Sequence, residues 1–235
     1  MKHVPNIITC LNLFAGCLSC IMTLEYHNYF GAFLFIILAA VFDFLDGFSA
    51  RLLKAFSPIG VQLDSLADIV SFGLAPGFMV FSFLNTASTG TFFETSFLPY
   101  SAFLIPIFSA LRLAKFNIDT RQRDSFLGLP VPANALFWAS LIPAMSPLLL
   151  VNGYETIICG TILVLILTFC LLMLSEIPMF SLKFKSYSWE QNQWAYLLIG
   201  IAVALTILLG FLGISLTIVC YILLSLIKTR FCTTP

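Results

Sequence analysis

The chain has 235 residues, of which 60% are hydrophobic and only 9% are charged, and its formal net charge is zero. Soluble domains carry about 25% charged residues, so this composition excludes an ordinary soluble protein and indicates one that crosses a lipid bilayer several times. The sequence has no basic stripe or tail, and it therefore gives no electrostatic support for nucleic acid as a partner.

Eight apolar segments are long enough to cross a bilayer, which takes about 20 helical residues. In chain order they are 5–24, 29–50, 60–84, 97–116, 131–151, 155–175, 192–209 and 211–228. We therefore expect an all-α, polytopic integral membrane protein that forms a single transmembrane domain over residues 1–235. Only Gly210 and Gly213 interrupt the last two segments, so a tight turn is expected there.

The basic residues predict how these eight helices are oriented. If the N-terminus is cytoplasmic, all 11 Lys and Arg residues fall at cytoplasmic helix ends or loops. The opposite loops then contain Glu25, Glu94 and Glu155 and no basic residue. This distribution follows the positive-inside rule. We expect a multi-pass protein of the cell (inner) membrane, with both termini and the active site facing the cytoplasm.

The first segment carries polar residues about one helical turn apart, at Asn6, Thr9 and Asn12. Polar side chains on a membrane helix either contact a ligand or hydrogen-bond a neighbouring helix. The spacing alone leaves both interpretations open.

The second and third segments carry a cluster of acids near their predicted cytoplasmic ends. Asp43 and Asp46 lie three residues apart, and Asp64 and Asp68 lie four apart, so each pair shares a helix face. Small residues on the same faces would let the two helices approach closely: Gly47, Ala50 and Gly60. Four carboxylates gathered in this way need cations, or else some of them must bind protons.

Oxygen ligands without His or Cys indicate Mg²⁺, Mn²⁺ or Ca²⁺ rather than zinc. Two such ions about 4 Å apart are a common arrangement for displacement at phosphorus, and the fixed charge of Arg51 suits a phosphate oxygen. The alternative is that the acids merely pair with Arg51 and Lys54 at the membrane surface. Two basic residues cannot neutralise four acids, so we favour a two-metal site with Mg²⁺ or Mn²⁺.

The acids form the pattern D-x-x-D-G-x-x-A-R-x8-G-x3-D-x3-D over residues 43–68. This pattern resembles the signature of the CDP-alcohol phosphatidyltransferase family. The resemblance implies transfer of a phosphatidyl group from a CDP-linked lipid to an alcohol, with release of CMP, and it suggests a homodimer. It also implies roles for matching residues: metal binding by Asp43, Asp46, Asp64 and Asp68, general base catalysis by Asp68, and contact with the cytidine diphosphate by Gly47, Ala50 and Arg51.

Further stretches resemble the bacterial integral-membrane members of the family that use serine as the alcohol. They lie at 5–19, 64–77, 110–118 and 126–135. The resemblance therefore implies CDP-diacylglycerol and L-serine as substrates, besides the surrounding membrane lipids. It places the catalytic helices at about 5–135, and the C-terminal helices at about 136–228 carry no motif that we can interpret.

The acceptor site has weaker candidates. Serine brings a carboxylate, for which basic residues near the cytoplasmic end of the fourth segment are candidates: Arg112, Lys115, Arg121 and Arg123. Each of these also belongs at that end for topological reasons alone. Ser71, one turn beyond Asp68, is a further candidate for the acceptor pocket, and Asn6 and Thr9 are candidates for contact with the CDP-lipid.

Two other functions remain open from the sequence. A sister enzyme with the same signature would use glycerol 3-phosphate or inositol phosphate, and its acceptor phosphate would call for a denser basic cluster. A divalent-cation transporter would use the acids as a permeation site, but such a site is expected near the bilayer midplane, with access from both sides.

Overall fold

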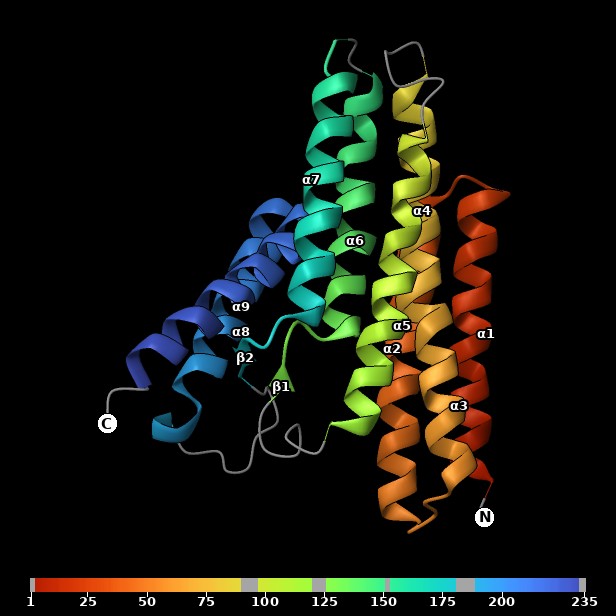
Figure 1. Ribbon diagram of the computed structural model, residues 1–235, viewed down its shortest axis with the longest axis vertical. Helices are drawn as coiled ribbons and strands as arrows, with labels where there is room; N and C mark the ends of the chain where they lie inside the picture. The colour runs from red at the N-terminus through yellow and green to blue at the C-terminus, as the bar shows by residue number, and fades with distance from the viewer. Residues whose placement is uncertain (1–2, 90–96, 120–125, 151–152, 181–188, 233–235) are drawn as a thin grey trace.

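A computed structural model describes residues 3–89, 97–119, 126–150, 153–180 and 189–232. This part of the chain is almost entirely helical (Figure 1). The α-helices are α1 (Val4–Leu24), α2 (Tyr29–Leu52), α3 (Pro58–Asp68), α4 (Ala75–Ser88), α5 (Leu104–Ile118), α6 (Val131–Met145), α7 (Glu155–Leu174), α8 (Trp189–Leu209) and α9 (Phe211–Cys232).

Shorter elements connect or extend these helices. A π-helix, η1 (Ile69–Leu74), joins α3 to α4, and 3-10 turns η2 (Leu98–Phe103) and η4 (Ser146–Leu150) adjoin α5 and α6. A two-stranded antiparallel ribbon forms between β1 (Phe126–Leu127) and β2 (Pro178–Met179). The ribbon ties the segment before α6 to the segment after α7.

Local sequence signals account for several helix boundaries. The side chain of Asn28 accepts a hydrogen bond from the backbone N–H of Gly31 at 2.8 Å and so caps α2. Ser57 caps α3 in the same way through Gly60, and Pro58 follows in the first turn, where its missing N–H is harmless. Gly210 has φ +57° between α8 and α9, which confirms the expected tight turn.

Seven helical segments among the described residues are long and apolar enough to cross a membrane. One of them is the continuous run α3–η1–α4 from Pro58 to Ser88. The eighth expected span, 131–151, is shorter than expected: α6 ends at Met145 and continues only as the 3-10 turn η4. Pro143 lies inside α6 and Pro147 follows it, and each lacks the backbone N–H that a regular α-helix uses.

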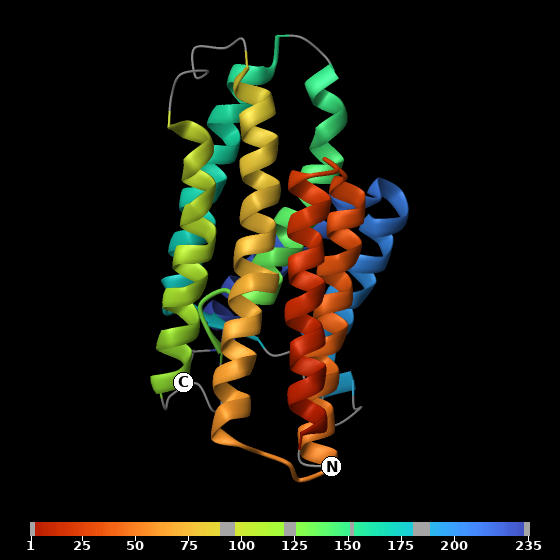
Figure 2. The same ribbon diagram turned by 90° about the vertical axis from the view of Figure 1, so that its right-hand side faces the viewer.

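The start of α1, the end of α2, the start of α3 and the end of α5 gather at one end of the bundle, which is the lower end in Figure 1. Arg51 at the end of α2 and Lys115 at the end of α5 therefore lie toward the same end of the bundle. Figure 2 shows α1 and α2 side by side, and α1 also packs against α3. Which membrane face this end occupies stays a prediction.

The apolar core lies between α4, α6 and α7. The ring of Phe137 stacks on that of Phe169, with centroids 3.9 Å apart, and the Trp138 ring meets Phe169 edge-on at 5.9 Å. The hairpin of α8 and α9 packs obliquely on α6 (Figure 1), where Ser140 and Ser215 share a 2.7 Å hydrogen bond. This half of the molecule supports the helices that carry the acids.

Candidate active site

Three of the predicted acidic residues converge between α2 and α3. One carboxylate oxygen from each of Asp43, Asp64 and Asp68 lies within 4.8 Å of the other two. Asp64 and Asp68 project from the same face of α3, one turn apart, while Asp43 approaches from α2. Asp68 is buried, with 8% exposure, and the other two are half-buried.

The fourth acid, Asp46, lies outside this group of three oxygens. It is 6% exposed, and its Oδ2 accepts a 2.6 Å hydrogen bond from the hydroxyl of Thr9 on α1. Asp46 lines a neighbouring pocket together with Asp64, so Asp64 belongs to both the carboxylate group and the pocket. The two features form one continuous site.

Helix α1 holds acids on both neighbouring helices. Thr9 bonds Asp46 of α2, and Asn12 donates through Nδ2 to Oδ1 of Asp68 of α3 at 3.3 Å. Ser71 of η1 in turn donates to the backbone carbonyl of Asn12 at 2.9 Å. Thr9 and Asn12 therefore both bond a neighbouring helix, and Thr9 also lines the pocket, so contact with a ligand stays a prediction.

An open pocket with a cavity volume of about 150 Å³ lies at the ends of α1, α2 and α3. Its lining residues are Pro5, Asn6, Thr9, Asp46, Gly47, Ala50, Ala55, Phe56, Ser57, Gly60, Val61 and Asp64. A Cβ added at Gly47 would meet no atom within 4 Å, so this face of α2 is free to accept a ligand.

The described residues leave the carboxylates without a basic partner. Among the described residues, the recorded ion pair joins Lys115 to Glu176, away from this group, and neither Arg51 nor Lys54 pairs with an aspartate. Burial beside other carboxylates is unfavourable for an acid unless positive charge is supplied. Three oxygens gathered in this way fit a hard divalent cation, for which oxygen ligands from carboxylates are suited.

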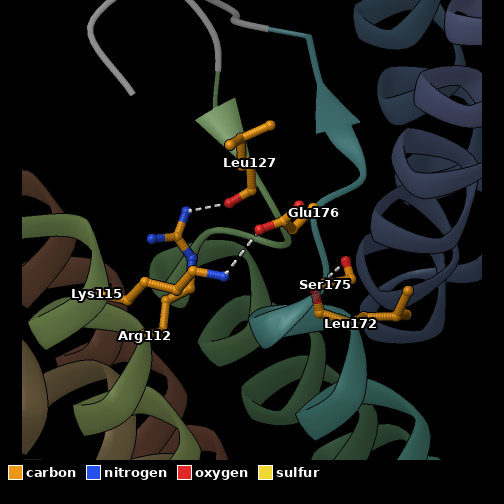
Figure 3. Close-up of polar contacts among 6 residues, drawn as sticks. All are labelled: Arg112, Lys115, Leu127, Leu172, Ser175 and Glu176. Atoms are coloured by element: carbon orange, nitrogen blue, oxygen red, sulfur yellow. Dashed lines mark hydrogen bonds and ion pairs between the residues drawn. The ribbon is translucent and has the colours of Figure 1, made fainter. Parts of the chain in front are cut away.

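Arg112 lies on the other side of η1, at the junction of α5, β1 and α6. It is 5% exposed, and it donates from Nε to the carbonyl of Leu129 at 3.0 Å and from Nη2 to that of Leu127 at 3.1 Å. Figure 3 shows the bond to Leu127 and, beside it, the 3.7 Å ion pair from Lys115 to Glu176. Both basic side chains therefore already have protein partners, and Arg112 fastens the segment that leads into α6.

The other predicted site residues have varied positions. Arg51 is exposed at the end of α2, and Ser71 is fully buried against α1. Arg121 and Arg123 lie outside the described residues. Pro5 and Ser57 also line the pocket, and neither was predicted from the sequence. For Ser57 a signal was present, because a Ser before a Pro is a recognisable helix start.

Comparison with known proteins adds a second line of evidence. The family model described as CDP-alcohol phosphatidyltransferase matches residues 2–207. A Bacillus subtilis protein named CDP-diacylglycerol–serine O-phosphatidyltransferase is 33% identical over 198 residues, which cover 83% of this chain and 99% of that relative.

Relatives with the same name occur in other organisms. The Helicobacter pylori J99 relative is 37% identical over 134 residues, a match that covers 56% of this chain but only 54% of that protein. The Methanocaldococcus jannaschii relative is 32% identical over 161 residues, covering 68% of this chain and 70% of that protein.

Proposed function

Since the chain belongs to the CDP-alcohol phosphatidyltransferase family, we propose that it transfers the phosphatidyl group of CDP-diacylglycerol to the hydroxyl of L-serine, giving phosphatidylserine and CMP. The observation that carries this proposal is the group of carboxylates from Asp43, Asp64 and Asp68, next to an open pocket. The choice of serine rests on the names of the relatives, the Bacillus subtilis protein in particular.

We assign the metal site to Asp43, Asp46, Asp64 and Asp68. Divalent ions held there, Mg²⁺ or Mn²⁺ in a two-metal site, supply positive charge that offsets the charge of the pyrophosphate and of the departing CMP. The three converging oxygens and the lack of a basic partner among the described residues support this assignment. Asp46 extends the acidic surface toward the pocket.

The pocket between α1, α2 and α3 is assigned to the cytidine diphosphate. Gly47 and Ala50 give it a face without bulky side chains, which supports close approach of a flat or charged group. Asn6 and Thr9 line the pocket from α1. Arg51, exposed at the end of α2, is assigned to the phosphates. The diacylglycerol then extends from the pocket into the surrounding lipid.

Asp68 is assigned the role of general base. It accepts the proton of the serine hydroxyl as the serine oxygen forms a bond to the phosphorus that carries diacylglycerol. The phosphorus–oxygen bond to CMP breaks in the same displacement, and CMP leaves with that electron pair. No separate nucleophile of the protein is needed, so no phosphatidyl-enzyme forms.

The serine carboxylate is assigned to the basic residues of α5 and the following loop. Arg112 uses two of its N–H groups on the carbonyls of Leu127 and Leu129. Its Nη1, which has no recorded bond to the described residues, is assigned to an anion. Lys115, Arg121 and Arg123 are further candidates, and Ser71 stands between this region and Asp68 along the chain. A cell (inner) membrane location, an active site on its cytoplasmic face and a homodimer stay predictions.

The test uses the purified full-length protein in lipid nanodiscs with CDP-diacylglycerol and Mg²⁺ or Mn²⁺. We expect labelled serine to enter lipid with stoichiometric release of CMP, and we expect chelation of divalent ions to stop the reaction until the ions are restored. Incorporation of glycerol 3-phosphate or inositol phosphate in place of serine would overturn the choice of alcohol. Divalent-ion flux across liposomes without any CMP release would instead favour the transporter.

A further inference from the structure

The side chain of Asn12 is fully buried, and only one of the two polar atoms of its amide has a hydrogen bond among the described residues. Its exposure is 0%, and its Nδ2 donates to Asp68 Oδ1 at 3.3 Å. Its Oδ1 is buried and has no hydrogen-bond partner among the described residues. An acceptor that is removed from water and left unpaired is unfavourable, so such atoms in native proteins call for an explanation.

The position of Asn12 is fixed by its surroundings. The hydroxyl of Ser71 holds the backbone carbonyl of Asn12 at 2.9 Å. One turn further along α1, a Cβ added at Gly16 would lie 2.8 Å from the Cα of Ser71, so the two backbones are in close contact there. The backbone of Asn12 therefore cannot move away from Asp68 without separating α1 from η1.

The orientation of the amide follows from its neighbour. A carboxylate only accepts hydrogen bonds, so the amide must present its NH₂ group to Asp68. Its carbonyl oxygen is attached to the same carbon and is then left beside the same carboxylate. A group that reaches Asp68 and carries further N–H or O–H donors would therefore meet Oδ1 of Asn12.

We propose that Asn12 sets the acceptor specificity of the enzyme: Nδ2 orients Asp68 toward the acceptor hydroxyl, and Oδ1 accepts a hydrogen bond from the ammonium group of the acceptor. This inference rests on the proposed function. Serine fits the arrangement because its hydroxyl and its ammonium lie on adjacent carbons. An amide also suits this position better than a carboxylate would, because another negative charge would repel Asp68.

Asn12→Leu removes both polar ends while retaining a similar side-chain shape, and Asn12→Ala is the second variant should the first fail to fold. The control is Ser19→Ala on the same buried face of α1, where the hydroxyl of Ser19 donates to the carbonyl of Ala32 at 2.9 Å. All proteins are studied at full length in nanodiscs, and folding is checked by thermal unfolding. The measurements are kcat, KM for serine, KM for CDP-diacylglycerol and the dependence of the rate on divalent ion concentration.

We expect each Asn12 variant to raise the KM for serine by roughly tenfold or more, as when a substrate loses its hydrogen-bonding group in a fitted site. The kcat should also fall, while KM for CDP-diacylglycerol and the metal dependence stay unchanged. The competitive inhibition constant of 3-hydroxypropionate, which has the hydroxyl and carboxylate of serine but no ammonium, should not change. Ser19→Ala should match the wild-type protein.

Three results would overturn the inference. An equal loss of affinity for serine and 3-hydroxypropionate would mean general damage to the acceptor pocket. A higher requirement for divalent ions would make Oδ1 of Asn12 a metal ligand, and unchanged serine kinetics would remove Asn12 from the acceptor site. Serine incorporation by the wild-type protein is measured separately, so a failure of the proposed function is distinguished from a failure of this inference.

Discussion

Helices α1 and α7 both cross the bundle, but they bury opposite kinds of side chain. The buried residues of α1 are small or polar: Pro5, Thr9, Asn12, Ala15, Gly16, Ser19 and Thr23. Those of α7 are apolar apart from two cysteine thiols: Ile158, Cys159, Ile162, Ile166, Phe169, Cys170 and Met173.

The two sets of buried residues indicate different roles: α1 positions the acids, and α7 supports the fold. In lipid, small residues allow close helix contact and buried hydroxyl or amide groups bond across helices, so α1 can hold the acids of α2 and α3 at fixed positions. Helix α7 instead fills space against Phe137 and Trp138. Substitutions on the polar side should therefore change the reaction, and substitutions on the apolar side should change stability.

The largest effect is expected from Asp64→Asn, because Asp64 belongs to both the carboxylate group and the pocket. CMP release should fall by about 1,000-fold, as when a charged group that stabilises a transition state is removed. The thermal unfolding temperature should change little. Glu155→Gln, at the opposite end of the bundle, is the matched control, and a similar loss of rate in that variant would contradict the assignment.

Phe169→Ala tests the apolar side of the comparison. It removes the ring that stacks on Phe137 and meets Trp138, and should lower the free energy of unfolding by about 3 kcal/mol. The rate per folded molecule should stay near that of the wild type. Leu171→Ala, an exposed position on the same helix, should have little effect on unfolding in detergent. Loss of activity in a fully folded Phe169→Ala protein would show that the two regions are not separable.

Gly47→Leu sharpens the comparison by adding bulk where the pocket is open. A Cβ meets nothing within 4 Å at Gly47, so the protein should fold normally. The KM for CDP-diacylglycerol should rise by roughly tenfold, which corresponds to about 1.4 kcal/mol of lost binding. Gly160 on α7 is equally open, so Gly160→Leu should leave both stability and KM unchanged. Unchanged lipid kinetics in Gly47→Leu would remove the nucleotide from this pocket.

The smallest effect is expected from Arg112→Lys. A lysine cannot reproduce both bonds of the guanidinium fork to Leu127 and Leu129, so stability should fall by about 1 kcal/mol. If Nη1 of Arg112 also holds the acceptor carboxylate, KM for serine rises about threefold, a change of about 0.6 kcal/mol. Serine kinetics equal to those of the wild type would limit Arg112 to its role in fastening the segment before α6.

The sequence predicted the fold class and the group of acids because both depend on local signals. Apolar length indicates membrane spans, and the four-residue spacing of Asp64 and Asp68 puts them on one face. The shortening of α6 was missed, although Pro143 and Pro147 are visible in the sequence. The three-residue spacing of Asp43 and Asp46 predicted that both would join the group of acids, but only Asp43 does. Asp46 instead accepts a hydrogen bond from Thr9 of another helix.

Contacts between distant segments could not be predicted. Arg112 bonds two carbonyls whose position depends on the pairing of β1 with β2, about 50 residues apart in the chain. The bond from Asn12 to Asp68 likewise depends on how α1 packs against α3 and η1. Spacing along one helix shows which residues share a face, but not which neighbouring atom that face meets.

The π-helix η1 begins directly after Asp68 and gives α4 its rotational setting. A π-helix accommodates an additional residue in what would otherwise be a regular α-helix. We expect a one-residue deletion within η1 to be absorbed by conversion of the π turn to regular α-helix. The same deletion within the regular helix α3 would turn everything beyond it by about 100°, since an α-helix has 3.6 residues per turn. Gly73 and Gly77, which pack against Pro106 of α5, would then swing out of register. The π turn therefore gives the span α3–η1–α4 a position at which its length can change by one residue while α4 keeps its orientation relative to Asp64 and Asp68.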